Sequence, residues 1–155
     1  MKTPGLRSPY EMAGGIVYFP RMLDKIRLHA AGQLPPDYVE NLGKGFDGRC
    51  CAFLGISYEA LRDHVLHATG EETGDEAIAT WAAEHGRNPS ETDKEVWNGF
   101  MTKRGWRDSS TGWLRFRIHE AGRPVDGSIL TMFDFIDADE ENPPRTFAAV
   151  TDPSL

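Results

Sequence analysis

Charged side chains cluster within an otherwise apolar stretch, residues 18–33, of sequence YFPRMLDKIRLHAAGQ. At 100° per residue, a helix here places Arg21, Asp24 and Lys25 on one face and the apolar residues on another, with His29 between the two. Arginine and lysine bind small anions through charge-assisted hydrogen bonds, and a neighbouring carboxylate can orient them. The pattern therefore allows either an ordinary solvated helix face, with a weak Arg21–Asp24 pair, or a polar pocket that recognises an anion.

A long connection follows this helix and carries further polar candidates. It spans residues 32–50, GQLPPDYVENLGKGFDGRC, with two prolines and several glycines. Connections of this length inside a compact domain are often functional. If the connection folds back over the charged face, it turns that face into a partly buried site. The candidate ligand-binding residues are then Arg21, Asp24, Lys25, His29, Tyr38, Asp47 and Arg49.

Two functions from different classes fit these residues. The first is a non-enzymatic binding or interaction module that recognises a small anionic ligand or a protein partner around Arg21 and Lys25. The second is a small enzyme that uses Asp24, His29 or Asp47 as acid–base groups on an anionic small-molecule substrate. No residue spacing typical of a catalytic motif occurs in the chain, which favours the binding module. A homo-oligomer remains open.

The other reactive residue types give weaker signals, and we expect no metal and no cofactor. His64 and His67 are spaced for two ligands on one helix, but no HExxH or paired-cysteine motif accompanies them, so ordinary helix histidines are favoured. Cys50 and Cys51 are adjacent, and neighbouring cysteines form a disulfide only with strain. We expect both thiols to be free and buried, which fits a reducing, cytoplasmic setting.

Charge is spread unevenly over the chain. The net charge of −7 disfavours nucleic acid and anionic lipid as partners. Residues 103–123 nevertheless hold six basic side chains against two acidic ones, interleaved with Trp106 and Trp113, and the acidic run DFIDADEEN follows. We expect the two segments to neutralise each other across a salt-bridged surface and the tryptophans to lie mostly in the core. A nucleotide contact at the basic segment, and a cation site at Asp134 and Asp137, are the alternatives.

Helix-start signals and apolar stripes predict the elements that position these groups. Apolar residues recur at helical spacing after each candidate N-cap, and the segment WLRFRIH is also assigned to a helix because no second alternating run could pair with it. The candidate N-caps are Ser8, Ser57, Thr73, Ser90 and either Asp126 or Ser128.

The chain is thus expected to be a single compact all-α domain of five to six short helices over residues 1–142, with an extended C-terminal arm at 143–155. No apolar run approaches the length that spans a bilayer, so no membrane association is expected, and MKTPGLRSPYEM lacks the apolar region of a secretory signal.

Several segments resemble a bacterial family of small helical proteins, the DUF5069 domain of unknown function. The resemblance runs from about Leu6 to Glu140 and is most specific in PRMLDKIR, FLGI and FDFIDADE. It implies an all-α fold and no known reaction. Phe46-Asp47 stands where the family suggests a Leu-Asp pair, and the double cysteine looks particular to this chain. The C-terminal arm falls outside the resemblance.

Overall fold

The computed structural model describes residues 1–145 and is all-α, as the sequence predicts. Eight α-helices and one two-stranded hairpin occur in this range, which is more helices than the five or six expected. Part of the excess is a single turn, α2, within the long connection. The elements are β1 (Met12–Ala13), β2 (Ile16–Val17), α1 (Phe19–Ala30), α2 (Pro36–Val39), α3 (Phe46–Leu54), α4 (Tyr58–His67), a 3₁₀ turn η1 (Gly70–Thr73), α5 (Asp75–His85), α6 (Glu91–Lys103), α7 (Thr111–Glu120) and α8 (Met132–Asp139).

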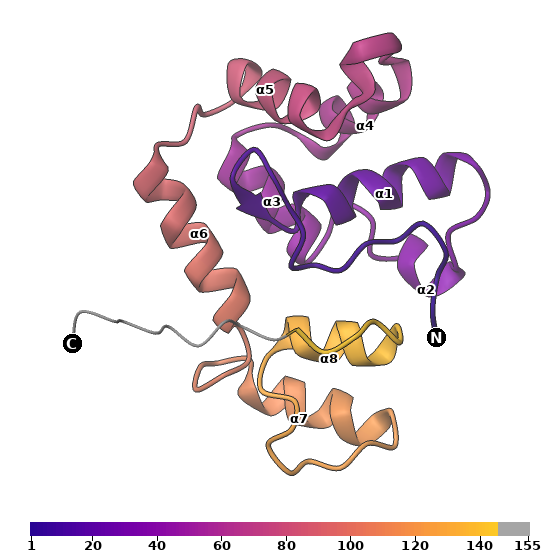
Figure 1. Ribbon diagram of the computed structural model, residues 1–155, viewed down its shortest axis with the longest axis vertical. Helices are drawn as coiled ribbons and strands as arrows, with labels where there is room; N and C mark the ends of the chain where they lie inside the picture. Colours follow the sequence, from indigo (N-terminus) through magenta and orange to yellow (C-terminus); the bar gives the residue numbers. More distant parts are fainter. Residues whose placement is uncertain (146–155) are drawn as a thin grey trace, which may run out of the picture.

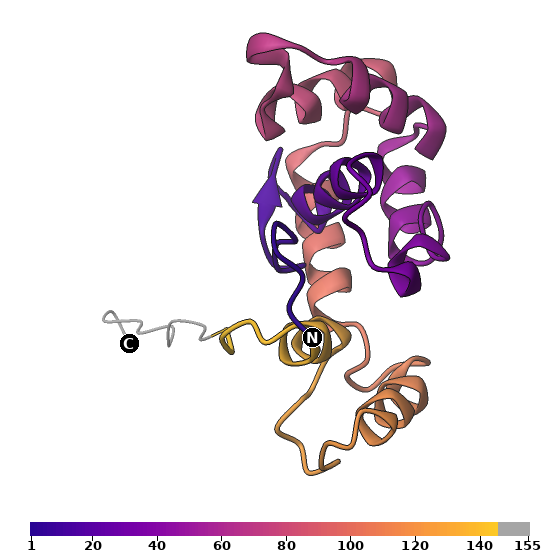
Figure 2. The same ribbon diagram turned by 90° about the vertical axis from the view of Figure 1, so that its right-hand side faces the viewer.

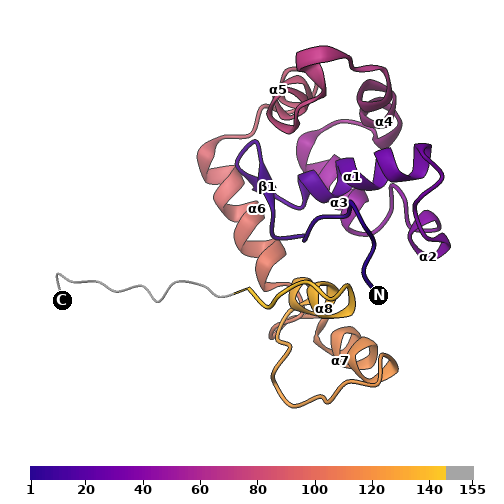
Figure 3. The ribbon, with the colours of Figure 1, turned by 45° about the vertical axis from the view of Figure 1, so that its right-hand side comes forward.

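The helices form two groups joined by α6 (Figure 1). Helices α2 to α5 lie around α1, and α6 runs from the α5 end to the opposite end of the molecule, where α7 and α8 lie. Figures 2 and 3 show that α8 lies between the α1 group and α7. Phe133 of α8 packs into the main core, whereas Phe135 packs with Leu114 and Ile118 of α7 in a second, smaller core. Helix α8 therefore connects the two groups.

The N-terminal segment contradicts the helix predicted after Ser8. Residues 12–17 form an antiparallel hairpin instead, with Ala13 paired to Ile16. Gly14 and Gly15 have φ angles of 61° and 78°, the positive values that a two-residue hairpin turn requires. The glycine pair between short apolar dipeptides therefore decides the local structure, and the Ser8 hydroxyl accepts from the Tyr10 backbone in a turn.

The remaining helix starts confirm some of the predicted caps. Ser57 accepts from the Ala60 backbone, and Ser90 forms a complete capping box with Asp93. Helix α5 begins at Asp75, after Gly74, so the cap predicted at Thr73 is wrong.

The cap predicted at Asp126 or Ser128 is also wrong, because Thr131 caps α8. The segment WLRFRIH is helical, as predicted. Of the expected C-terminal arm, residues 146–155 lie outside the described range. No helix within residues 1–145 is long and apolar enough to cross a membrane.

Candidate functional site

The charged face of α1 is buried, so its interpretation as a solvated face is wrong. Arg21, Asp24 and Lys25 are 4%, 8% and 6% exposed, respectively. The expected Arg21–Asp24 pair is replaced by three separate ion pairs with residues from other parts of the chain. Since a buried charge is stable only with a partner, these contacts determine what the face can do.

Lys25 lies in a buried hydrogen-bond cluster with Asp47 and Tyr18. Its ammonium donates to the Asp47 carboxylate at 2.5 Å and to the Tyr18 hydroxyl at 3.0 Å. The same Asp47 oxygen accepts from the Tyr18 hydroxyl at 2.6 Å, and its other oxygen accepts from the Gly43 backbone at 3.0 Å. Burial lowers the pKa of the Lys25 ammonium, and the Asp47 carboxylate opposes this shift. Burial, with the charge of Asp47, raises the pKa of Tyr18 well above its usual value.

Arg21 forms a bidentate ion pair with Glu140, the residue directly after the end of α8. Its two terminal nitrogens donate to the two carboxylate oxygens at 2.8 and 2.5 Å, and both side chains are 4% exposed. The Tyr38 hydroxyl donates to the same carboxylate at 2.9 Å, and burial followed by the charge of Glu140 raises the pKa of Tyr38 to about 12. Sequence reasoning missed Glu140 as a partner, although it belongs to the acidic run already noted.

Asp24 accepts both from the Arg7 side chain and from its backbone. The Arg7 guanidinium donates at 2.9 Å from two nitrogens, and the backbone nitrogen donates at 3.0 Å. Arg7 also pairs with Asp75 at the start of α5. Through these contacts, the N-terminal segment is fixed to both α1 and α5.

The structure thus brings five of the seven candidate residues into this buried network and leaves two outside it. Tyr38 and Asp47 fold back over α1, as the long connection suggested. His29 is exposed near the end of α1, and Arg49 is exposed with its guanidinium 5.3 Å from the Phe100 ring centre. Asp24 and Asp47 are held by different cations, so the proposed acid–base set does not share one site.

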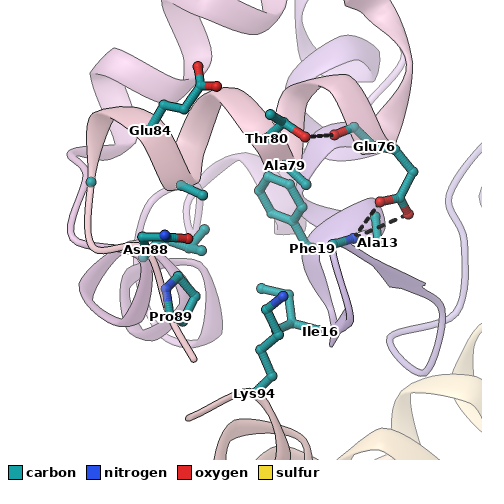
Figure 4. Close-up of a pocket in the computed structure, with 14 residues that line it drawn as sticks. Ala13, Ile16, Phe19, Glu76, Ala79, Thr80, Glu84, Asn88, Pro89 and Lys94 are labelled. Atoms are coloured by element: carbon teal, nitrogen blue, oxygen red, sulfur yellow. Dashed lines mark hydrogen bonds between the residues drawn. The ribbon is translucent and has the colours of Figure 1, made fainter. Parts of the chain in front are cut away.

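A groove of about 770 Å³ lies next to this network, between the hairpin, α5 and the start of α6. Its apolar lining includes the partly exposed Ala79 and Pro89, and the buried side chains of Phe19 and Ile16 lie at its base (Figure 4). Lys94 extends from α6 toward Ile16, and Asn88 lies beside Pro89 at the edge of the groove. Volumes of this size hold small organic ligands.

Two acidic side chains, Glu76 and Glu84, also line the groove. Both carboxylate oxygens of Glu76 accept from the Gly14 backbone nitrogen, at 3.2 and 3.1 Å. The Glu84 carboxylate turns away from the Phe19 ring (Figure 4). Among the described residues that line the groove, Lys94 has the one positive charge.

The buried network and the groove share their supporting elements. Tyr18 adopts a left-handed backbone conformation, with φ of 77°, which is uncommon for any residue but glycine. Its hydroxyl is held by Asp47 and Lys25, and the next residue, Phe19, lines the groove. Asp47 and Leu54 belong to the same helix, α3, so the network holds in place the elements that carry two lining residues, Phe19 and Leu54.

The remaining reactive residues are explained by packing. Cys50 and Cys51 are free and buried, as predicted, and burial raises the pKa of Cys51 to about 11, so neither thiol is activated as a nucleophile. His67 bonds the Asp63 carbonyl at 2.6 Å, while the His64 ring stacks on Trp81 at 3.9 Å. No group of three or more potential metal ligands occurs among residues 1–145.

We expected ion pairs between the basic segment, residues 103–123, and the acidic run DFIDADEEN, but the ion pairs of the basic segment lie within that segment. Lys103, Arg104 and Arg117 pair with acidic groups of their own segment. On α8, the Asp134 carboxylate accepts from Tyr10 and the Asp137 carboxylate accepts from Ser8. The prediction that the tryptophans lie mostly in the core is only partly confirmed. Trp97 is buried, whereas Trp106 and Trp113 are 41% and 54% exposed.

The comparisons with known proteins agree with the resemblance seen in the sequence. No curated protein matches the chain. The family model of the domain of unknown function DUF5069 matches residues 3–142 of the 155 residues, which includes all of the helices described above. The chain therefore belongs to the DUF5069 family.

Proposed function

We propose that this protein is a non-enzymatic binding module for a small carboxylate ligand with an apolar body, held in the groove between the hairpin, α5 and α6. The observation that carries the proposal is the groove itself: a partly exposed apolar surface of Ala79, Ala83 and Pro89, next to the single ammonium of Lys94 among its described lining residues. Ligand sites combine apolar surface with polar groups that fix the orientation of the ligand, and this groove offers both.

The polar face around Arg21 and Lys25 has a structural part in this proposal and does not contact the ligand. Each of these cations already holds an internal carboxylate, so an external anion would first have to displace Glu140 or Asp47. Displacement would leave a second buried charge unpaired, at a large cost in free energy. We therefore assign the anion-recognising role to Lys94, whose side chain is 23% exposed and whose pair with the exposed Glu91 is weak.

The enzyme alternative has less support. Its three candidate groups are separated, since His29 is exposed and the two carboxylates are bound to Arg7 and Lys25. The two free, buried cysteines support a reducing compartment, and we propose a cytoplasmic location on that basis.

Thermal unfolding with two matched probes tests the proposal. Phenylacetate, with a carboxylate on an apolar ring, should raise the melting temperature at millimolar concentration, because a ligand that binds only the native state stabilises it. Phenylacetamide, its neutral analogue, should raise it less. Lys94→Gln should weaken phenylacetate binding about tenfold, since a charged hydrogen bond is lost.

Lys44→Gln is the control, because it removes the same charge from an exposed lysine outside the groove. The proposal fails if neither probe shifts the melting temperature, if both shift it equally, or if Lys94→Gln binds phenylacetate as the wild type does.

A further inference from the structure

Another groove, of about 390 Å³, lies between the N-terminal segment, the end of α6 and the start of α8. Its walls include Tyr10, Trp106, Leu130 and Thr131. Trp106 and Leu130 expose large apolar side chains to water there, 41% and 50% exposed, respectively. Apolar side chains that gather beside a groove often mark an interaction site, because their burial against a partner is favourable.

The polar groups of this groove already have partners. The Tyr10 hydroxyl donates to the Asp134 carboxylate at 2.6 Å and lies 3.3 Å from the Thr131 hydroxyl. The Lys103 ammonium pairs with Asp108, which does not line the groove. The groove therefore suits an uncharged, apolar occupant better than an ionic ligand.

The last described residue, Arg145, lies beside this groove. Its Nη2 donates to the Glu11 carboxylate at 3.2 Å, and its guanidinium lies 5.1 Å from the centre of the Tyr10 ring. The residues that follow, 146–150, have the sequence TFAAV, an apolar run with one aromatic ring. Phe147 is two residues beyond Arg145, and two residues span at most about 7 Å, so this ring belongs to the part of the chain nearest the groove.

We propose that residues 147–150 of this chain, FAAV, dock in this groove. The Phe147 ring packs there against Trp106 and Leu130, and the burial of an aromatic ring between two exposed apolar side chains is favourable. Arg145 places the start of the segment at the groove, and so short a tether gives a local concentration on the order of millimolar. The docked segment joins the N-terminal segment, α6 and α8 at one place.

Two other occupants are less favoured. The same segment of a second chain binds only at the bulk concentration of the protein, without the advantage of the tether. An apolar segment of a different protein has to compete with residues 147–150, which are always present beside the groove. The chain's own segment needs no partner and meets no competitor.

Nuclear Overhauser contacts in the full chain test the proposal. The Phe147 ring protons should show contacts to the Leu130 methyl groups and to the Trp106 ring. A mixture of isotope-labelled and unlabelled chains separates contacts within one chain from contacts between chains. Phe147→Ser should shift the amide signals of Leu130 and Thr131. Leu155→Ser, the same loss of an apolar side chain outside residues 147–150, is the control and should leave them unchanged.

Chymotrypsin cleavage after Phe147, followed by mass spectrometry, gives an independent readout, because a docked segment is cleaved only when it opens. Leu130→Ser should speed this cleavage at least about threefold. Val125→Ser, a similar change at a 51% exposed side chain outside the groove, should not. Thermal unfolding confirms that each variant remains folded.

Three results overturn the proposal. The first is the absence of contacts from the Phe147 ring to Trp106 and Leu130. The second is contacts that occur only between labelled and unlabelled chains, which assign the groove to a second copy. The third is a cleavage rate that Leu130→Ser leaves unchanged. These outcomes leave the carboxylate groove untouched, because the two grooves share no lining residue.

Discussion

Each buried charge on α1 has one specific partner, and the loss of either partner leaves the other unpaired. Asp47 shows this best, because its two oxygens together accept from Lys25, Tyr18 and the Gly43 backbone. Asp47→Asn removes the counter-charge of Lys25, and we expect it to lower the free energy of unfolding by about 3–5 kcal/mol.

Lys25→Met combined with Asp47→Asn removes both charges and should recover part of that loss. Urea unfolding of the two single variants and the double variant measures the coupling between the residues. A single-variant loss below about 1 kcal/mol would mean that the pair is not buried in solution.

The His64 ring provides a second prediction at this scale. It stacks between α4 and α5 on Trp81, whose other neighbour is the His85 ring, 4.6 Å away. Burial lowers the pKa of His64, the negative charge of Glu72 opposes this shift, and His85 adds to it. A lowered pKa means that the proton binds the unfolded chain more tightly. The stabilisation is therefore complete above the ordinary histidine pKa of about 6.5 and is lost as the pH falls through the folded-state value.

Histidine NMR titration checks this directly. The midpoint of His64 should lie below the ordinary histidine value of about 6.5, and His64→Gln should lose less stability than the wild type between about pH 7.5 and 5.5. A His64 midpoint at or above about 6.5 would contradict the packing of His64 on Trp81.

At the scale of elements, the hairpin depends on two glycines. Gly14 has φ of 61°, and a Cβ atom there would lie 2.7 Å from Cβ of Ala79 on α5. Gly14→Ala should therefore destabilise the protein by about 1–3 kcal/mol. Gly99→Ala in the exposed part of α6 meets no atom within 4 Å and should stabilise it by about 0.5–1 kcal/mol. Thermal unfolding of the two variants compares them, and effects of the same sign would contradict the hairpin.

The helices that begin with a capping residue and continue with an apolar stripe could be predicted from the sequence. The hairpin at residues 12–17 could not, because its strands are too short to show a pattern. Ser57 and Ser90 were identified as caps because a cap and the following apolar stripe agree. The hairpin has only two residues in each strand, so no alternation of apolar and polar residues could reveal it. The glycine pair was the available signal, but Ser8-Pro9 preceding it also matched a helix start, and local patterns do not decide between the two.

At the scale of the whole molecule, ion pairs and hydrogen bonds join segments that are far apart in the chain. Arg21 and Glu140 are separated by 119 positions, and their pair fastens α8 to α1. Glu140→Gln should weaken this attachment, because the Arg21 charge then lacks its counter-charge.

Hydrogen exchange of the full chain measures the consequence. Glu140→Gln should reduce protection in α8, where local opening becomes easier, and leave α4 and α5 nearly unchanged. Uniform loss of protection over all helices would show instead that the pair stabilises the protein globally.

These long-range contacts also explain why the candidate site could be predicted only in part. A helical wheel placed Arg21, Asp24 and Lys25 on one face, and the long connection correctly suggested that Tyr38 and Asp47 cover it. The wheel cannot show which distant side chain neutralises each charge, so Glu140 and Arg7 were missed. The groove could not be predicted either, because the hairpin that forms one wall was not recognised.

A ¹H–¹⁵N NMR map of phenylacetate binding tests the position of the site most directly. We expect the largest shift changes on the groove, at Gly14, Phe19, Ala79 and Lys94, and we expect them to need about tenfold more phenylacetate in Lys94→Gln but not in Lys44→Gln. Shift changes centred on Arg21, Lys25 and Tyr38 instead would mean that the buried cations themselves receive the ligand, and would contradict the assignment of the site to the groove.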